Sequence, residues 1–205
     1  MSDILGYGED ALTLWALKNC LKQVLVIFND NTNPKDCLIF YRPSFGRSGG
    51  KGNSEFGEFD AIVASREKYY LMESKWDNHS KYEKESLILR EEQLLRHEVF
   101  TWYLFNWGTK YSGNWGLFKI EQEKGLEKLN KTIPPADSLL AKNLESVLAQ
   151  IVNYLSCDSI QTPVRNVLLF FYNGKHSKPP SKTNNGFIIV PIDYGQISNT
   201  NFIPI

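Results

Sequence analysis

The spacing of apolar residues along the chain predicts helices that alternate with short strands. Residues 8–28 place leucines and other apolar side chains at helical intervals around much of their circumference, which predicts a helix that packs against a sheet. Apolar runs of strand length predict strands at residues 36–42, 59–65, 69–75, 166–172 and 186–192. Further helices are predicted at residues 82–107 and 137–156, with Asp137 as the cap of the second.

This order of elements predicts an α/β fold in which a central mixed β-sheet of about four to five strands is flanked by helices. The segment that follows the long helix is irregular and rich in glycine, tryptophan and lysine, so an insertion is predicted at about residues 108–135. With 205 residues, of which 42% are hydrophobic, the chain suits one domain that spans residues 1–205 and has a substantial core.

The strands predicted at residues 59–65 and 69–75 carry formal charges only at one end of the pair. Asp60 opens the first strand, and Glu73 and Lys75 close the second. Because side chains alternate along a strand, an even-numbered connecting loop places Asp60, Glu73 and Lys75 on one face. Burying these charges costs several kcal/mol each unless they are paired or bind a cation.

A hard divalent cation would explain this arrangement. Mg²⁺ prefers oxygen ligands and is commonly held by one or two carboxylates while it also contacts substrate phosphates. A lysine two residues from a metal ligand can orient a metal-bound water, help to deprotonate it, or screen charge that develops on a phosphate. The structural alternative is a cross-strand ion pair of Lys75 with Asp60 or Glu73, which contributes at most about 1 kcal/mol if exposed.

Asp60, followed by Glu73-Ser74-Lys75 on the next strand, resembles the Asp and Glu-x-Lys elements of the PD-(D/E)xK nuclease superfamily, which has the restriction-endonuclease-like fold. Phe59 stands in place of the Pro in the family's name. The resemblance implies a core of helix, three-stranded meander, helix, strand and commonly a further strand or helix, and the predicted order of elements agrees with it. It also implies a metal site formed by Asp60, Glu73 and the Ser74 backbone carbonyl, with Lys75 positioning or activating the attacking water.

Glu9 lies in the first turn of the helix predicted at residues 8–28. The superfamily often places a glutamate in its first helix, so the resemblance makes Glu9 a candidate for a catalytic role as an additional metal or water ligand. The alternative is a carboxylate that is favoured by the helix dipole, a contribution under about 1 kcal/mol.

The loop at residues 43–57 is a candidate for substrate contact. It contains five glycines and the cations Arg47 and Lys51, and Arg42 directly precedes it. Glycines let a backbone approach phosphate closely, and Arg or Lys side chains can contact the nucleic-acid backbone. The alternative is an exposed loop without such a role.

Gln93, Arg96 and His97 share one stripe of the helix predicted at residues 82–107. Their place is similar to that of a Gln-x-x-x-Tyr element that contacts the substrate strand in some branches of the superfamily, with His97 where the Tyr would be. These three residues are therefore candidates for substrate binding. The alternative is an exposed polar face.

The numbers of charged residues and cysteines limit the kinds of surface and metal site that the chain can form. The chain has 23 lysines and arginines and 23 aspartates and glutamates, so a nucleic-acid surface must arise from local segregation of charge. No basic leader or apolar run of about 18 to 20 residues is present, so a cytoplasmic location without membrane contact is expected. Cys20, Cys37 and Cys157 fit neither a disulfide framework nor a zinc site and are predicted to be reduced, mostly buried thiols.

These features predict a Mg²⁺-dependent endonuclease, with Mn²⁺ as a substitute ion, that hydrolyses phosphodiester bonds in double-stranded DNA in the manner of a restriction enzyme. Cutting both strands usually calls for two active sites, so a homodimer is expected. A junction, repair, defence or RNA nuclease of the same fold is an alternative. An alternative from a different class is a catalytically silent nuclease-fold module that binds nucleic acid or a protein partner.

Overall fold

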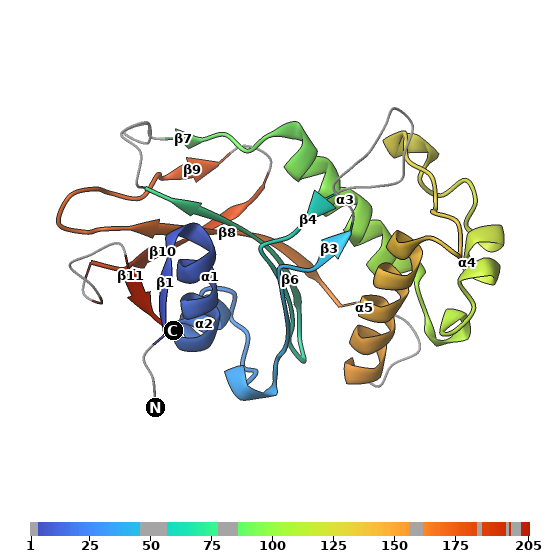
Figure 1. The fold of residues 1–205 in the computed structure, drawn as a ribbon, viewed down its shortest axis with the longest axis horizontal. Coiled ribbons are helices and arrows are strands. Elements are labelled where there is room, and N and C mark those ends of the chain that lie inside the picture. Colours follow the sequence, from blue (N-terminus) through green and yellow to red (C-terminus); the bar gives the residue numbers. More distant parts are fainter. Residues whose placement is uncertain are drawn as a thin grey trace. The chain divides into compact units, whose positions relative to one another are not determined.

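The computed structural model describes residues 4–45, 57–77, 86–155, 162–183, 186–195, 197 and 202–205 (Figure 1). The chain divides into two compact units, each assembled from separate segments. The first unit consists of Met1–Arg42, Phe59–Leu89 and Val164–Ile205, and the second of Pro43–Glu58 and Arg90–Pro163. The insertion predicted at about residues 108–135 lies within the second unit, and the organisation as one domain stays a prediction.

A mixed sheet forms the centre of the first unit, with the strand order β10-β8-β6-β5-β2. β2, β5 and β6 form an antiparallel meander, whereas β8 is parallel to β6 and β10 is parallel to β8. The predicted mixed sheet of four to five strands is thereby confirmed. The strands are Leu38–Tyr41 (β2), Ala61–Ala64 (β5), Tyr69–Trp76 (β6), Val164–Tyr172 (β8) and Ile188–Asp193 (β10).

Two helices, α1 (Gly8–Asn19) and α2 (Leu21–Ile27), pack against one face of this sheet (Figure 1). The single helix predicted at residues 8–28 is therefore interrupted at Cys20, whose φ of −114° and ψ of 2° depart from helical values. Both helices bury leucines in one core with alternate residues of the strands. This core includes Leu12, Leu17, Leu21, Leu25, Val63, Met72 and Leu169.

Short paired strands complete the first unit. β1 (Leu5–Tyr7) pairs antiparallel with β11 (Phe202–Pro204), and β7 (Ser86–Leu87) pairs parallel with β9 (Lys182–Thr183). The strand predicted from residue 36 begins later, because Asp36 belongs to the 3₁₀-helix η1 (Pro34–Asp36).

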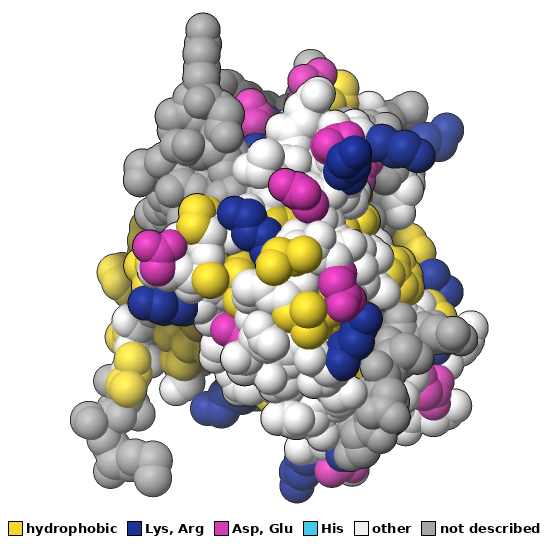
Figure 2. Space-filling view, turned by 90° about the vertical axis from the view of Figure 1, so that its right-hand side faces the viewer, with side chains coloured by type: hydrophobic (Ala, Val, Ile, Leu, Met, Phe, Trp, Pro, Cys, Tyr) yellow, Lys and Arg dark blue, Asp and Glu magenta, His cyan; other side chains and the backbone are white. Residues whose placement is uncertain are grey.

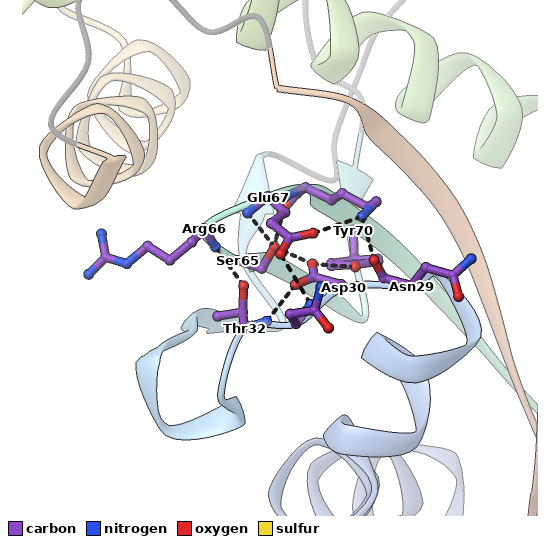
Figure 3. Close-up of polar contacts among 9 residues, drawn as sticks. Asn29, Asp30, Thr32, Ser65, Arg66, Glu67 and Tyr70 are labelled. Atoms are coloured by element: carbon purple, nitrogen blue, oxygen red, sulfur yellow. Dashed lines mark hydrogen bonds and ion pairs between the residues drawn. The ribbon is translucent and has the colours of Figure 1, made fainter.

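Asp30 anchors the loop between β5 and β6 to the segment that follows α2 (Figure 3). Asp30 is 2% exposed and accepts hydrogen bonds from Ser65 Oγ at 2.5 Å, Tyr70 OH at 2.6 Å and Thr32 N at 2.9 Å. Ser65 Oγ in turn accepts a hydrogen bond from Lys68 N at 2.8 Å. Because each of these buried polar groups has a partner, the loop is fixed at the end of the hairpin that lies away from Asp60.

The second unit is helical and has an aromatic core. Its elements are β3 (Ser44–Phe45), β4 (Gly57–Glu58), α3 (Glu91–Asn106), η2 (Thr109–Tyr111), α4 (Trp115–Glu121), η3 (Glu127–Leu129) and α5 (Leu139–Leu155). The segment predicted to be irregular thus contains α4 and two 3₁₀-helices. The aromatic rings of α3, η2 and α4 contact one another and include those of Trp102, Tyr103, Trp107, Tyr111, Trp115 and Phe118.

The helix predicted at residues 82–107 begins at Glu91. Gln93 Oε1 accepts a hydrogen bond from Arg90 N at 3.2 Å, and Gln93 N donates to Arg90 O, so the first turn is closed at this point. Part of the predicted helix is instead the strand β7, which pairs with β9. The prediction of one long helix here is wrong.

The cap of α5 also differs from the prediction. Ser138 Oγ, and not the Asp137 side chain, accepts the hydrogen bond from Ala141 N, at 3.1 Å. A serine hydroxyl and an aspartate carboxylate both serve well as N-caps, so neighbouring Asp and Ser residues leave the position of a helix start ambiguous by one residue.

No helix among the described residues is long and apolar enough to cross a lipid bilayer. Cys20 and Cys37 are free and half-buried, so the expectation of buried thiols is only partly correct for them. Cys157 lies outside the described residues.

Candidate functional site

Several strand ends meet at one edge of the central sheet. Because β2 and β6 run antiparallel to β5, and β8 and β10 run parallel to β6, the C-terminal ends of β2, β6, β8 and β10 lie at the same edge as the N-terminal end of β5. The first turn of α1 reaches this edge. We call a subset of the charged residues there the polar edge, namely those near the ends of β2, β5 and β6 and the first turn of α1; they are Glu9, Asp10, Arg42, Asp60, Glu73 and Lys75.

Asp60 and Glu73 lie opposite each other at the end of the β5–β6 hairpin. The register pairs Ala61 with Met72, so extending it by one residue places Asp60 opposite Glu73. Directly opposed residues share a face of the sheet, and Lys75, two residues beyond Glu73, shares that face as well. The register therefore agrees with the predicted placement of all three charged residues on one face.

The carboxylates of Asp60 and Glu73 are held in a largely buried environment. Glu73 is 1% exposed, and Asp60 Oδ2 accepts a hydrogen bond from Ser74 N at 2.7 Å. Burial raises the pKa of Asp60 to about 6, and the neighbouring Glu73 carboxylate adds to this rise. The Ser74 N–H and the Lys75 ammonium offset part of it. A cation would stabilise such a pair of adjacent carboxylates.

Glu9 reaches from the first turn of α1 to the end of β6. Its Oε1 lies 3.4 Å from Lys75 Nζ, and its Oε2 accepts a hydrogen bond from Trp76 N at 3.0 Å. A hydrogen bond of 2.7 Å between the hydroxyls of Thr13 and Ser74 holds α1 against the strand. Burial raises the pKa of Glu9, and Lys75 lowers it in part. The structure thus brings Glu9 to the residues predicted for the metal site.

Ser74 contributes backbone groups to two side chains of the polar edge. Its N–H donates to Asp60, and its carbonyl oxygen accepts a hydrogen bond from Lys75 Nζ at 2.5 Å. The carbonyl that was predicted as a metal ligand is therefore occupied by an ammonium group in this structure. Within the described residues the ion pair of Lys75 is with Glu9, and not with Asp60 or Glu73 as the structural alternative predicts.

The donor set suits a hard divalent cation through two carboxylates. Among the residues that the structure describes, no group of three or more His, Cys, Asp or Glu side chains could hold a metal ion. Mg²⁺ commonly uses only one or two carboxylates and completes its shell with water and phosphate oxygens. Asp60 and Glu73 supply that number, and an ion between them would relieve their mutual repulsion.

Comparisons with known proteins give no match for this chain: no protein-family model, no curated protein and no solved structure matches it. The indication of function therefore comes from the residues of the polar edge and from the strands that bring them together.

Gln93, Arg96 and His97 lie on α3, in the second unit. Gln93 is 4% and His97 1% exposed, and Arg96 is half-buried, so the alternative of an exposed polar face is wrong. Gln93 also closes the first turn of α3 through its hydrogen bond from Arg90 N. A role of these residues in substrate contact stays a prediction.

Of the cations predicted near Asp60, Arg47 and Lys51 lie outside the described residues, whereas Arg42 lies at the polar edge. Arg42 N donates a hydrogen bond to Asp60 O at 3.1 Å, and Arg42 Nη1 is paired with Asp10 Oδ2. Arg42 was predicted only as a cation beside the loop that is a candidate for substrate contact, and Asp10 was not assigned a role. The available signal was position, because Arg42 ends the strand predicted at residues 36–42 and Asp60 lies at the start of the one predicted at residues 59–65.

Charges of both signs are mixed on one face of the molecule. On the described residues of the face drawn in Figure 2, lysine and arginine side chains are interspersed with acidic and hydrophobic ones. This mixing agrees with the equal numbers of acidic and basic residues, 23 each. A polyanion that approached this face would meet local cations and not a uniform basic field.

Proposed function

We propose that this protein is a Mg²⁺-dependent endonuclease that hydrolyses phosphodiester bonds. The observation that carries the proposal is the opposed pair Asp60 and Glu73, which shares one face of the sheet with Lys75. Two adjacent carboxylates repel each other, and Mg²⁺ is a cation that can bind between such a pair.

We further propose that the first unit has the core of the restriction-endonuclease-like fold. The order of α1, the meander β2-β5-β6, α3 and the parallel strand β8 supports this proposal. Asp60 then directly precedes the second strand of the meander, and Glu73-Ser74-Lys75 lies on the third, as the resemblance to the nuclease superfamily implies.

The side chains of the polar edge have distinct roles in this proposal. Bound Mg²⁺ would lower the pKa of a water molecule and stabilise negative charge on the phosphate. Asp60 and Glu73 would hold the ion. Lys75, whose Nζ is restrained by Ser74 O and Glu9 Oε1, would orient the attacking water or screen the phosphate. Glu9 would position Lys75.

Double-stranded DNA is the proposed substrate, and a homodimer is the proposed assembly. Each chain contributes one pair Asp60 and Glu73, so cleavage of both strands of a duplex calls for two copies. Mn²⁺ is expected to replace Mg²⁺, because both are hard ions that accept oxygen ligands.

Cleavage of nucleic acid that requires Mg²⁺ or Mn²⁺ is the first expected result. Supercoiled plasmid, linear duplex, branched DNA, single strands and structured RNA would be incubated with the wild-type protein and with Asp60→Asn and Glu73→Gln. Each substitution should lower the cleavage rate at least about 100-fold, because loss of a metal ligand removes several kcal/mol of transition-state stabilisation. The preferred substrate would identify the branch of nuclease.

Asp36→Asn is a matched control, because Asp36 is exposed and lies before β2, at the end of that strand opposite Arg42. It should leave cleavage unchanged. Absence of cleavage with every substrate, together with absence of Mg²⁺ and Mn²⁺ binding in calorimetry, would contradict the proposal and favour a nucleic-acid or protein-binding module.

Replacing Lys75 with alanine should slow cleavage by about 100-fold or more while the affinity for Mn²⁺ is kept, because Lys75 would act on water or phosphate and would not ligate the ion. Single-turnover cleavage and calorimetric Mn²⁺ titration measure the two effects separately. Lys18→Ala removes the same charge from the last turn of α1 and serves as the control. Cleavage by Lys75→Ala at the full rate would remove Lys75 from the mechanism and leave the metal site in place.

A further inference from the structure

The segment that follows β8 separates charge within a chain that is neutral as a whole. Residues 173–192 contain three lysines and one histidine but no aspartate or glutamate. We propose that the start of this segment binds phosphates of the nucleic-acid backbone that flank the cleaved bond. We call Lys175, His176 and Lys178 the basic turn. This inference rests on the proposed nuclease function and adds to it a surface that would hold the substrate.

Asp77 holds the basic turn against the end of β6. Its Oδ2 accepts hydrogen bonds from Asn173 N at 3.1 Å and from Ser177 Oγ, and its Oδ1 accepts one from Tyr194 OH at 3.1 Å. Within the turn, Asn173 O accepts hydrogen bonds from His176 N at 2.8 Å and from Ser177 N at 2.9 Å. The backbone from Asn173 to Ser177 is therefore fixed at both ends.

Asp193, the last residue of β10, is a second anchor of the turn. Its Oδ1 accepts hydrogen bonds from Gly174 N at 3.0 Å and from Gly195 N at 2.8 Å. A Cβ atom at position 174 would lie 2.4 Å from Asp193 Oδ2, so glycine permits this close approach of the carboxylate. The carboxylates of Asp77 and Asp193 thus accept hydrogen bonds from the backbone and from hydroxyl groups of the turn and its surroundings.

The side chains of the basic turn are exposed. Within the part of the chain that the structure describes, none of them forms an ion pair or a hydrogen bond with another residue. Lys68, Lys75 and Lys110, in contrast, each pair with a glutamate. Exposed cations on a fixed backbone suit the phosphates of a nucleic acid, because lysine contacts phosphate as a point charge and an ordered backbone costs little entropy on binding.

The basic turn lies at the same edge of the sheet as the polar edge. β6 and β8 run parallel and pair Lys75 with Phe170, and the turn begins at Asn173, three residues later. At about 3.3 Å per residue, the turn begins about 10 Å beyond Lys75 along the strand direction. About three base pairs of a duplex, at about 3.4 Å each, span this distance. A duplex with one phosphate at the polar edge can therefore bring a flanking phosphate to the basic turn.

The double variant Lys175→Gln/Lys178→Gln tests this inference, because it removes two exposed charges and leaves both anchors of the turn in place. Binding of a short fluorescein-labelled duplex without divalent metal would be followed by anisotropy at several salt concentrations. The dissociation constant should rise about tenfold, and the magnitude of the slope of log affinity against log salt should fall by about two. In cleavage with Mg²⁺, KM should rise while kcat stays unchanged, because the basic turn does not contact the reacting phosphate.

Two further variants serve as comparisons. Lys22→Gln/Lys35→Gln removes the same two charges from exposed positions, on α2 and in η1, and should keep the wild-type affinity and salt slope. Lys175→Arg/Lys178→Arg keeps both charges and should also keep the wild-type salt slope.

The outcomes separate the two proposals. If the wild-type protein cleaves DNA, Asp60→Asn does not, and Lys175→Gln/Lys178→Gln has wild-type affinity and salt slope, the role of the basic turn is overturned and the nuclease proposal stands. The role of the turn is also overturned if Lys22→Gln/Lys35→Gln weakens binding equally. If the wild-type protein neither binds nor cleaves nucleic acid with either metal ion, both proposals are overturned.

Discussion

Replacing Asp60 with asparagine is expected to make the metal-free protein more stable at about pH 8, by about 1 to 3 kcal/mol in the free energy of unfolding. Burial and the Glu73 carboxylate raise the pKa of Asp60 from its ordinary value of 3.8 to about 6, so the folded protein holds an unfavourable charge at this pH. Asparagine removes the charge and keeps an oxygen that can accept the hydrogen bond from Ser74 N. The same change should abolish metal-dependent cleavage.

The pH dependence of this effect has a definite sign. Between about pH 4 and pH 6 the folded state binds more protons at Asp60 than the unfolded state, so the wild-type stability falls as pH rises through this window. The difference in free energy of unfolding between Asp60→Asn and the wild type should be small near pH 4 and should reach its full size above about pH 6. Urea unfolding in the presence of a chelator, repeated at several pH values, measures it.

Asp36→Asn controls for the removal of a carboxylate and should change stability little at any of these pH values, because Asp36 is exposed. If Asp60→Asn were instead less stable than the wild type at about pH 8, Asp60 would be a structural group whose charge stabilises the fold, and the argument for a cation at this position would fail.

Asp30 should behave in the opposite way, with a loss of about 3 kcal/mol or more in the free energy of unfolding when it is replaced by alanine. The buried hydroxyls of Ser65 and Tyr70 both donate to Asp30 Oδ2 and would lose their acceptor. Unfolding in urea at neutral pH measures the loss. Substitutions at Asp30 and at Asp60 therefore contrast a carboxylate that stabilises the fold with one that destabilises it.

The pH dependence at Asp30 follows from its hydrogen bonds. Burial alone would raise the pKa of Asp30, but the bonds from Ser65, Tyr70 and Thr32 outweigh it and lower the pKa below its ordinary value of 3.8. The stability that this carboxylate contributes is present above the ordinary value and is lost as pH falls through the folded value. Asp30→Asn should therefore approach wild-type stability only in strong acid.

A double-mutant cycle tests the contacts of Asp30 directly. Tyr70→Phe removes one donor, so its cost in the Asp30→Ala protein should be smaller than in the wild type, because the hydroxyl has already lost its acceptor. Equal costs in both proteins would show that the hydrogen bond from Tyr70 is not what makes Asp30 stabilising.

The hairpin and the shared face of its charged side chains could be predicted from the sequence, because both depend on interactions between residues that are close in sequence. Alternation of side chains and an even loop place Asp60, Glu73 and Lys75 on one face, and the register agrees. The ion-pair partner of Lys75 could not be predicted, because Glu9 lies on a helix that is distant in sequence. A hydrogen bond between Thr13 and Ser74 holds that helix against the strand.

The wrongly predicted elements depend on partners that are distant in sequence or on small differences in energy between adjacent residues. Ser86–Leu87 became a strand because Lys182–Thr183 pairs with it, and no local pattern could show this. The interruption at Cys20 has no glycine or proline to mark it. The Ser138 cap and the Asp137 cap are close in energy, so the sequence alone could not choose between them.

The parallel pairing of β6 with β8 separates the formation of the carboxylate pair from its burial during folding. Asp60 and Glu73 are joined by one tight hairpin, and a β-hairpin forms within about 1 to 10 μs. Glu73 pairs with Leu168 only after the intervening chain has been made, and a contact so distant in sequence forms late. Before β8 is synthesised, the carboxylates of Asp60 and Glu73 would therefore be hydrated and would repel each other only weakly. Their repulsion would grow when β8 pairs with β6 and the carboxylates are removed from water.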